Sequence, residues 1–95
     1  MADYFARVEL HGANWPNDYA VLHNALAKHG FTNCVVTGDG RNLRLPRGSY
    51  YSTNRIDDNT LVATAVKDCA NSTGYKNEVF VVKAVGWYGF LNYSC

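Results

Sequence analysis

The sequence predicts one small α+β domain of the ferredoxin-like βαββαβ kind, with two helices on one face of a four-stranded antiparallel sheet. Three observations support this fold class. Apolar and polar residues alternate over Tyr4–Leu10, which is the period of a half-buried strand. Apolar residues recur at helical spacing over 19–29 and 61–69, and Glu78–Val85 is rich in valine. A chain of 95 residues has room for one core, so we expect a single domain over 1–95.

The first helix has clear signals at both ends. The predicted strand stops at His11, and Trp15–Asp18 then opens the helix, with its proline at a first-turn position where the missing N–H costs nothing. Gly30 is a natural residue just beyond the last turn. Phe31 follows it and is expected to pack back onto the helix.

The middle of the chain predicts a hairpin. Thr32–Thr37 and Arg41–Leu45 are short strand-like runs on either side of the turn Gly38–Gly40. A proline and a glycine then interrupt the ladder. Ser49–Thr53 is therefore either a continuation past a bulge or an edge segment.

A second helix is expected to start near Asp57 or Asp58, since either aspartate can cap it. Asn71–Gly74 ends it, and the valine-rich strand Glu78–Val85 follows. The expected buried stripe of this helix consists of Leu61, Val62, Ala65, Val66 and Cys69.

The tail over 86–95 is unusually aromatic for the end of a chain. We expect its rings to cover a sheet edge or the partner subunit of a homodimer, and a set of stacking platforms for bases is the alternative. The predicted interface residues are Trp87, Tyr88, Phe90 and Tyr93.

Composition narrows the classes of function. A net charge of +1 produces no strong electrostatic attraction for the phosphates of RNA, so RNA binding would depend on a local cluster of cations. We expect a cytoplasmic protein, because no secretion signal or membrane span is visible. The three cysteines, Cys34, Cys69 and Cys95, lack zinc-site spacing and are expected to be reduced thiols. We expect no metal and no cofactor.

The open face of the sheet is one candidate binding surface. Phe5, Arg7 and Glu9 alternate with the buried side of the first strand and are expected on this face. An aromatic ring beside a cation suits base stacking and phosphate contact. The alternative is a face used for dimerisation.

Cations and tyrosines also cluster in the middle of the chain. The cluster favours a patch that tracks phosphates, and a solvated strand edge is the alternative. It contains Arg41, Arg44, Arg47, Arg55, Tyr50 and Tyr51. The residues expected to bind RNA are Arg7, Arg41, Arg44, Arg47 and Tyr50.

His11 is the candidate catalytic base. It follows the first strand, where the chain leaves the sheet, and an imidazole there suits proton abstraction from a ribose 2′-hydroxyl. Glu9 and Asp39 are the candidate carboxylates beside it. The alternative is an ordinary histidine at a strand end.

Over Tyr4–Val85 the chain resembles the small enterobacterial and phage proteins grouped with the GhoS endoribonuclease-antitoxins. The residues that carry this resemblance are Ala6–Ala13, Asp18–Tyr19, Leu22–His23, Gly30–Phe31, Gly38–Gly40, Leu45–Pro46 and Ser49–Tyr51. The resemblance implies a ferredoxin-like fold close to that of the CRISPR adaptation nuclease, often dimeric, and cleavage of a toxin messenger RNA. In the related nuclease an acidic residue ends the first strand, whereas this chain has His11 there and Glu9 two residues earlier.

Two classes of function follow from these observations. The first is an RNA-binding endoribonuclease or antitoxin. The second is a protein without enzymatic activity that acts through the aromatic tail and the sheet edge, such as a phage-encoded anti-CRISPR or other anti-defence inhibitor.

Overall fold

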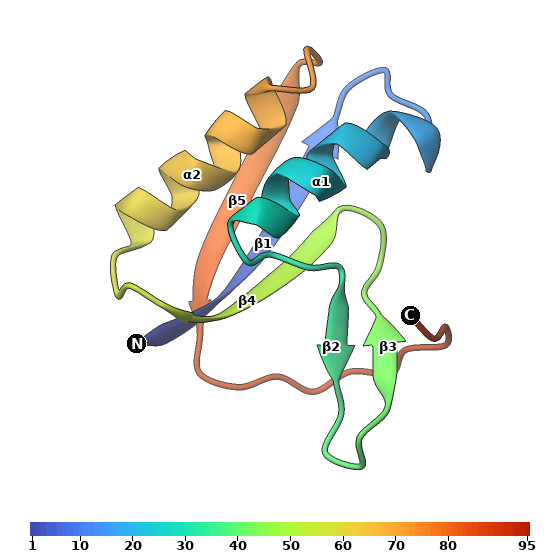
Figure 1. The fold of residues 1–95 in the computed structure, drawn as a ribbon, viewed down its shortest axis with the longest axis vertical. Helices are drawn as coiled ribbons and strands as arrows, with labels where there is room; N and C mark the ends of the chain where they lie inside the picture. Colours follow the sequence, from blue (N-terminus) through green and yellow to red (C-terminus); the bar gives the residue numbers. More distant parts are fainter.

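The computed structural model describes residues 1–53 and 55–95 and shows a small α+β domain. Two helices lie on the same side of an antiparallel sheet, and a short hairpin projects beyond the end of that sheet (Figure 1). In chain order the elements are β1 (Ala2–Leu10), a 3₁₀ turn (Asn17–Tyr19), α1 (Ala20–Lys28), β2 (Cys34–Val36), β3 (Asn42–Arg44), β4 (Ser49–Arg55), α2 (Asn59–Asn71) and β5 (Asn77–Ala84).

The main sheet has three strands in the order β4-β1-β5, and both pairs are antiparallel. The main sheet thus has three strands where four were expected, because β2 and β3 form a separate two-stranded sheet. The predicted second strand touches the main sheet only at a bridge between Thr32 and Tyr51, with backbone N–H···O bonds of 3.0 and 2.8 Å. Beyond that bridge β2 turns away to pair with β3, and Pro46–Gly48 interrupts the ladder between β3 and β4.

The alternation of β1 divides the sheet into a buried and an open face. Tyr4, Ala6 and Val8 are fully buried under the helices, whereas Arg7 and Glu9 are exposed on the other side. The helices contribute buried residues to the same core: Leu22, Leu26, Val62, Val66, Cys69 and Ala70. The predicted stripe of the second helix is confirmed apart from two positions, since Leu61 is exposed and Ala65 is only half-buried.

Both helix boundaries are set by local chemistry. Asp58 caps α2, since its side chain accepts a 3.1 Å hydrogen bond from the N–H of Leu61. Asp57 instead pairs with Lys83 across the end of the sheet. The predicted end of the first helix is confirmed, because Gly30 has a φ of +79° and the buried Phe31 bonds back to the helix.

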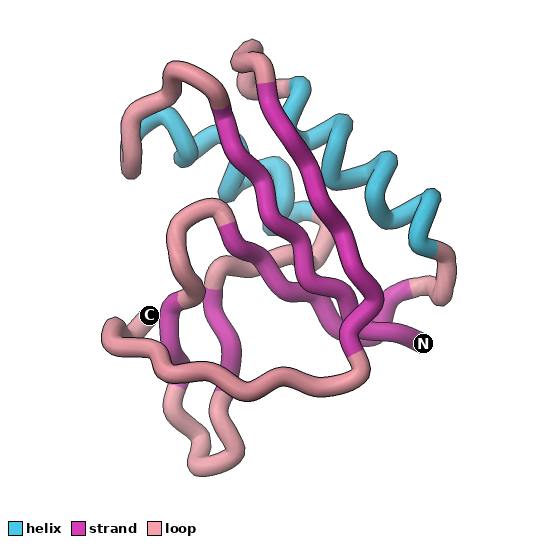
Figure 2. The backbone as a smooth tube through the Cα atoms, turned by 180° about the vertical axis from the view of Figure 1, so that it is seen from behind, coloured by secondary structure: helices cyan, strands magenta, loops and turns pink.

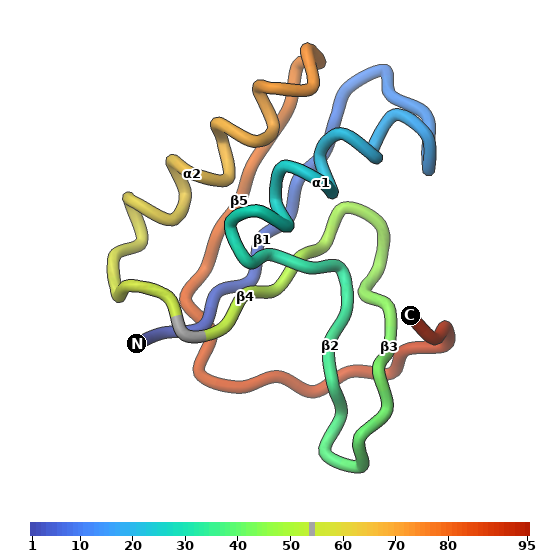
Figure 3. Tube along the Cα trace, in the orientation of Figure 1, coloured from blue at the N-terminus to red at the C-terminus, as the bar shows by residue number. Residues whose placement is uncertain are grey.

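A disulfide joins Cys34 to Cys95, so the expectation of three thiols is wrong. Cys69 alone is free and is buried, as predicted. From the end of β5 the tail crosses the hairpin and reaches the outer edge of β3 (Figure 3). There the backbone of Arg44 bonds to that of Tyr93 at 2.8 Å. Cys34 and Cys95 are 61 residues apart, so no local sequence pattern predicted that the tail returns to the hairpin.

No helix within residues 1–53 and 55–95 is long and apolar enough to span a membrane. The longer one, α2, has 13 residues, compared with about 20 for a bilayer crossing.

Candidate nucleic-acid interface

Figure 2 views the sheet from the side that the helices leave open. The strand register sets a row of apolar residues on this face. Phe5 lies in the middle strand, directly opposite Tyr51 on one side and Val82 on the other. Residues opposite each other in neighbouring strands project from the same face about 5 Å apart. This row forms an apolar strip across all three strands.

The next row along the sheet adds a cation and an exposed ring. Arg7 lies opposite Phe80 on β5 and Ser49 on β4. Phe80 is 67% exposed, which is unusual for a phenylalanine. Arg7 is exposed as well, so the register sets a cationic and an aromatic residue opposite each other on the open face.

A histidine and two carboxylates lie at the end of the same face. His11 Nε2 is 3.5 Å from a carboxylate oxygen of Glu78, and the two side chains are 46% and 74% exposed. Glu9, the predicted partner of His11, lies opposite Glu78 in the register. The carboxylate that contacts His11 is that of Glu78. Asp39, the other predicted carboxylate, lies in the turn of the hairpin between β2 and β3. In the part of the chain that the structure describes, no three His, Cys, Asp or Glu side chains gather as a metal site.

The predicted cluster of arginines does not form one patch. The Arg41 side chain binds Asp39 at 3.0 Å, and the Thr37 hydroxyl together with Arg41 lowers the pKa of that carboxyl. Arg44 lies over the ring of Tyr93, with 5.8 Å from its guanidinium carbon to the ring centre. These two cations therefore belong to the hairpin and the tail.

Arg55 is also removed from the open face. Its guanidinium bonds to the backbone oxygen of His29 and lies 5.2 Å from the centre of the Phe31 ring. Arg55 therefore holds the end of α1 rather than extending an arginine patch.

Of the four arginines, Arg47 is the one that meets Arg7. The Arg7 Nη1 atom donates to the backbone oxygens of Arg47 at 3.0 Å and Val8 at 3.4 Å. Gly48, with a φ of +76°, allows this approach, since an added Cβ would lie 2.5 Å from the Val8 oxygen. The Arg47 guanidinium in turn lies 5.7 Å from the centre of the Trp15 ring.

The assignment of Tyr50 to RNA binding is wrong in this structure, because its ring is 1% exposed. Its alternation partner on the open face is Tyr51. The Tyr50 ring meets His23 edge-on at 5.3 Å. Burial raises the pKa of the Tyr50 hydroxyl and lowers the pKa of His23.

The tail covers the hairpin with its backbone and leaves its rings in solvent. Tyr88 and Phe90 are 88% and 90% exposed, and their ring centres lie 5.5 Å apart. Tyr93 is 69% exposed and Trp87 is 43% exposed. The tail thus presents an exposed aromatic surface, as an interface would require.

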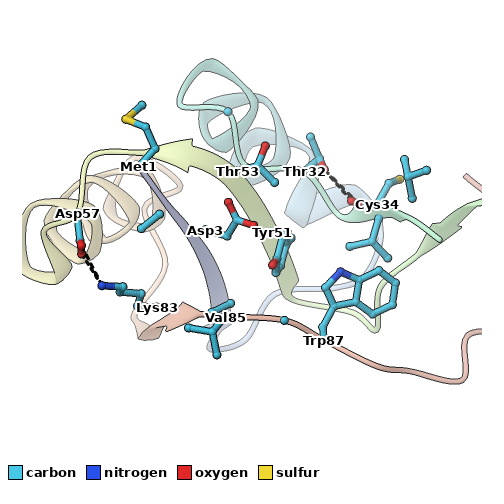
Figure 4. Close-up of a pocket in the computed structure, with 16 residues that line it drawn as sticks. Met1, Asp3, Thr32, Cys34, Tyr51, Thr53, Asp57, Lys83, Val85 and Trp87 are labelled. Atoms are coloured by element: carbon cyan, nitrogen blue, oxygen red, sulfur yellow. Dashed lines mark hydrogen bonds and ion pairs between the residues drawn. The ribbon is translucent and has the colours of Figure 1, made fainter. Parts of the chain in front are cut away.

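A hollow of about 780 Å³ lies between the end of the sheet and the start of the tail (Figure 4). Tyr51 and Trp87 border it, and the 2.9 Å ion pair between Lys83 and Asp57 lies at its far end. The hydrogen bond to Asp57 raises the pKa of Lys83. Burial, followed by the charge of Asp3, raises the pKa of Tyr51.

No family model and no curated protein matches this chain.

Three residues at or beside the open face were not singled out as site residues from the sequence: Phe80, Glu78 and Trp15. Phe80 and Glu78 lie in a run where valines occupy both faces of the strand. Alternation alone therefore did not show which face each of the two residues occupies. Their pairing with β1 identifies their face. Trp15 was read only as the start of a helix, yet its ring reaches Arg47 from the loop after β1.

Proposed function

We propose that this protein binds single-stranded RNA on the open face of its three-stranded sheet. The observation that carries the proposal is the register that sets Arg7 beside Phe80 and Phe5 beside Tyr51 on an uncovered surface. Exposed rings provide stacking for unpaired bases, and the guanidinium provides a contact for the phosphate between them. A net charge of +1 is compatible with this mode, since stacking supplies much of the affinity.

The same proposal includes a ferredoxin-like fold with a shortened fourth strand. The order β5-β1-β4, continued by the Thr32–Tyr51 bridge, follows the split βαβ arrangement. Both helices on one face leave the other free. The resemblance to GhoS-type antitoxins favours RNA, and in particular a toxin messenger RNA, as the ligand.

RNA cleavage is the activity that the histidine favours. In our proposal, Glu78 holds the proton of His11 on Nε2, so that Nδ1 is the free base. Nδ1 removes the proton of a ribose 2′-hydroxyl, and the 2′-oxygen attacks the adjacent phosphorus. The bond to the 5′-oxygen breaks, and that oxygen takes a proton from water. The imidazolium returns its proton to the resulting hydroxide, and a 2′,3′-cyclic phosphate remains. Glu78 thus replaces Glu9 as the carboxylate partner.

Binding and cleavage are tested separately. Fluorescence anisotropy with labelled single-stranded RNA at 50 and 200 mM salt tests binding, and we expect saturable, salt-sensitive association. A time course with wild type, His11→Asn and Glu78→Gln tests cleavage. We expect the histidine variant to bind normally and lose cleavage. Absence of RNA binding at low salt would contradict the whole proposal.

A second candidate function rests on the tail. Tyr88 and Phe90 are almost fully exposed, while the disulfide and the β3 pairing fix the tail in place. A rigid exposed aromatic surface suits a protein partner. This observation favours a non-enzymatic inhibitor, such as an anti-CRISPR or other anti-defence protein. Deleting residues 86–95 would abolish capture of such a partner and leave RNA binding unchanged.

An RNA ligand places the protein in the cytoplasm, where disulfides are normally reduced. With the Cys34–Cys95 disulfide reduced, the tail is expected to leave the hairpin, whereas the sheet that carries the proposed RNA surface has a core without tail residues. The homodimer expected from the sequence stays a prediction. Light scattering over a dilution series tests it, and a monomer at every concentration would contradict it.

A further inference from the structure

A small hollow of about 360 Å³ lies at the end of the open face. It is formed between β1, the loop that follows β1 and the loop before β4. Three kinds of chemistry meet in it: an indole ring, a carboxylate and two guanidiniums. Its lining includes Trp15, Glu9, Arg7 and Arg47.

The indole is held in place before any ligand arrives. The ring of Trp15 packs against Tyr19, with 5.2 Å between ring centres, and against His23 at 5.3 Å. The Tyr19 hydroxyl accepts a 3.0 Å hydrogen bond from the backbone N–H of Leu10. Trp15 is therefore anchored on the side of the core, and its other side meets Arg47.

The Glu9 carboxylate and the Arg47 guanidinium beside this ring are not paired with each other. Among residues 1–53 and 55–95, the Glu9 carboxylate makes no hydrogen bond or ion pair. The Arg47 guanidinium likewise has only its contact with Trp15. Arg7 is different, because two backbone oxygens fix its guanidinium and leave its remaining N–H groups to the hollow.

This combination selects among ligands by charge. The Glu9 carboxylate would repel a bare phosphate, and the two guanidiniums would repel a bare cation. A flat ring with hydrogen-bond donors on one edge and acceptors on the other satisfies both. Guanine has this pattern, with N1–H and N2–H₂ as donors and O6 and N7 as acceptors.

We propose that this hollow is a guanine-binding pocket, and that the protein prefers RNA with a guanosine at the corresponding position. The base stacks on Trp15 after displacing the Arg47 guanidinium, which then donates to O6 and N7. Glu9 accepts from N1–H and N2–H₂. Arg7 and Glu9 belong both to the open sheet face and to this hollow. The inference therefore rests on the proposed function for the statement that the guanosine is part of an RNA strand.

The first test compares four labelled hexauridine probes, one unmodified and three with a single central guanosine, inosine or adenosine. Inosine lacks the N2 amino group, and adenosine lacks both the N1–H donor and O6. We expect guanosine to bind about tenfold more tightly than adenosine, with inosine between them. In Glu9→Gln the ratio should fall toward one. Asp68→Asn, which removes one charge on the helix layer, should keep the wild-type ratio.

The second test uses free guanosine and adenosine monophosphate with a Trp87→Phe protein, in which Trp15 is the remaining tryptophan. We expect quenching of Trp15 fluorescence by the guanine nucleotide at concentrations where the adenine nucleotide has no effect. RNA binding without a preference for guanosine, or a preference that survives Glu9→Gln, would overturn the pocket and leave the proposed function standing. Guanine-specific quenching without RNA binding would overturn the proposed function and keep the pocket.

Discussion

Arg7 on β1 lies directly opposite Phe80 on β5, on the face of the sheet that no helix covers. We predict that Phe80→Ala weakens RNA binding about tenfold, because one stacked base is worth about 1–3 kcal/mol. The free energy of unfolding should change by less than about 0.5 kcal/mol, since the ring is 67% exposed. Anisotropy titrations and urea denaturation measure the two quantities.

The matched control for Phe80→Ala is Leu61→Ala. Leu61 is another exposed apolar side chain, 56% exposed, but it lies on α2 and away from the open face. It should leave RNA affinity unchanged. An equal loss in both variants would mean that Phe80 acts through stability rather than through contact.

Gly48 is predicted to be the least replaceable glycine in the loop beside Arg7. An alanine Cβ there would collide with the Arg7 guanidinium and lie 2.5 Å from the backbone oxygen of Val8, and the φ of +76° adds strain. We expect Gly48→Ala to lower the free energy of unfolding by more than about 2 kcal/mol and to weaken RNA binding. Gly40→Ala, with φ +86° and open space around it, should cost only about 1–2 kcal/mol. Equal losses by thermal denaturation would contradict this reading.

The tail is predicted to detach without unfolding the domain. The core cluster contains no residue beyond Val81, so reduction of Cys34–Cys95 should release residues 86–95 and leave Tyr4 and Val8 buried. For a separation of 61 residues, the loss in unfolding free energy should not exceed about 4 kcal/mol. Hydrogen exchange of reduced and oxidised protein measures this, and loss of protection throughout β1 on reduction would contradict it.

Stability is predicted to fall at mildly acidic pH because of His23. Burial lowers the pKa of His23, so as pH drops below about 6.5 the unfolded chain takes up a proton that the native state resists. The native state loses stability over that range, and the loss levels off below the folded pKa. His23→Phe should reduce the loss between pH 7.5 and 5.5 in urea denaturation. A loss of the same size in the variant would contradict the assignment.

Local signals in the sequence were sufficient for the helices and for the faces of the first strand. The cap at Asp58, the end at Gly30 and the alternation of Tyr4–Leu10 each depend on neighbouring residues, and all three are confirmed. The split of the sheet was not predictable in the same way. β2 meets β4 only at the Thr32–Tyr51 bridge and then pairs with β3, and this change of partner involves residues far apart in the sequence.

The candidate site shows the same division between local and distant information. Phe5, Arg7 and His11 were predicted from the strand that carries them. Phe80 and Glu78 required the register between β1 and β5, which the run of valines obscures. Tyr50 was assigned to the surface because nearby arginines suggested it, whereas the register turns its ring into the core.

The most direct test is an NMR titration of isotope-labelled protein with single-stranded RNA. The account predicts that the shifted resonances gather at Phe5, Arg7, Phe80 and His11, with the helix layer and the tail unaffected. Shifts confined to residues 86–95, or no shifts at saturating RNA, would contradict the open sheet face as the binding surface.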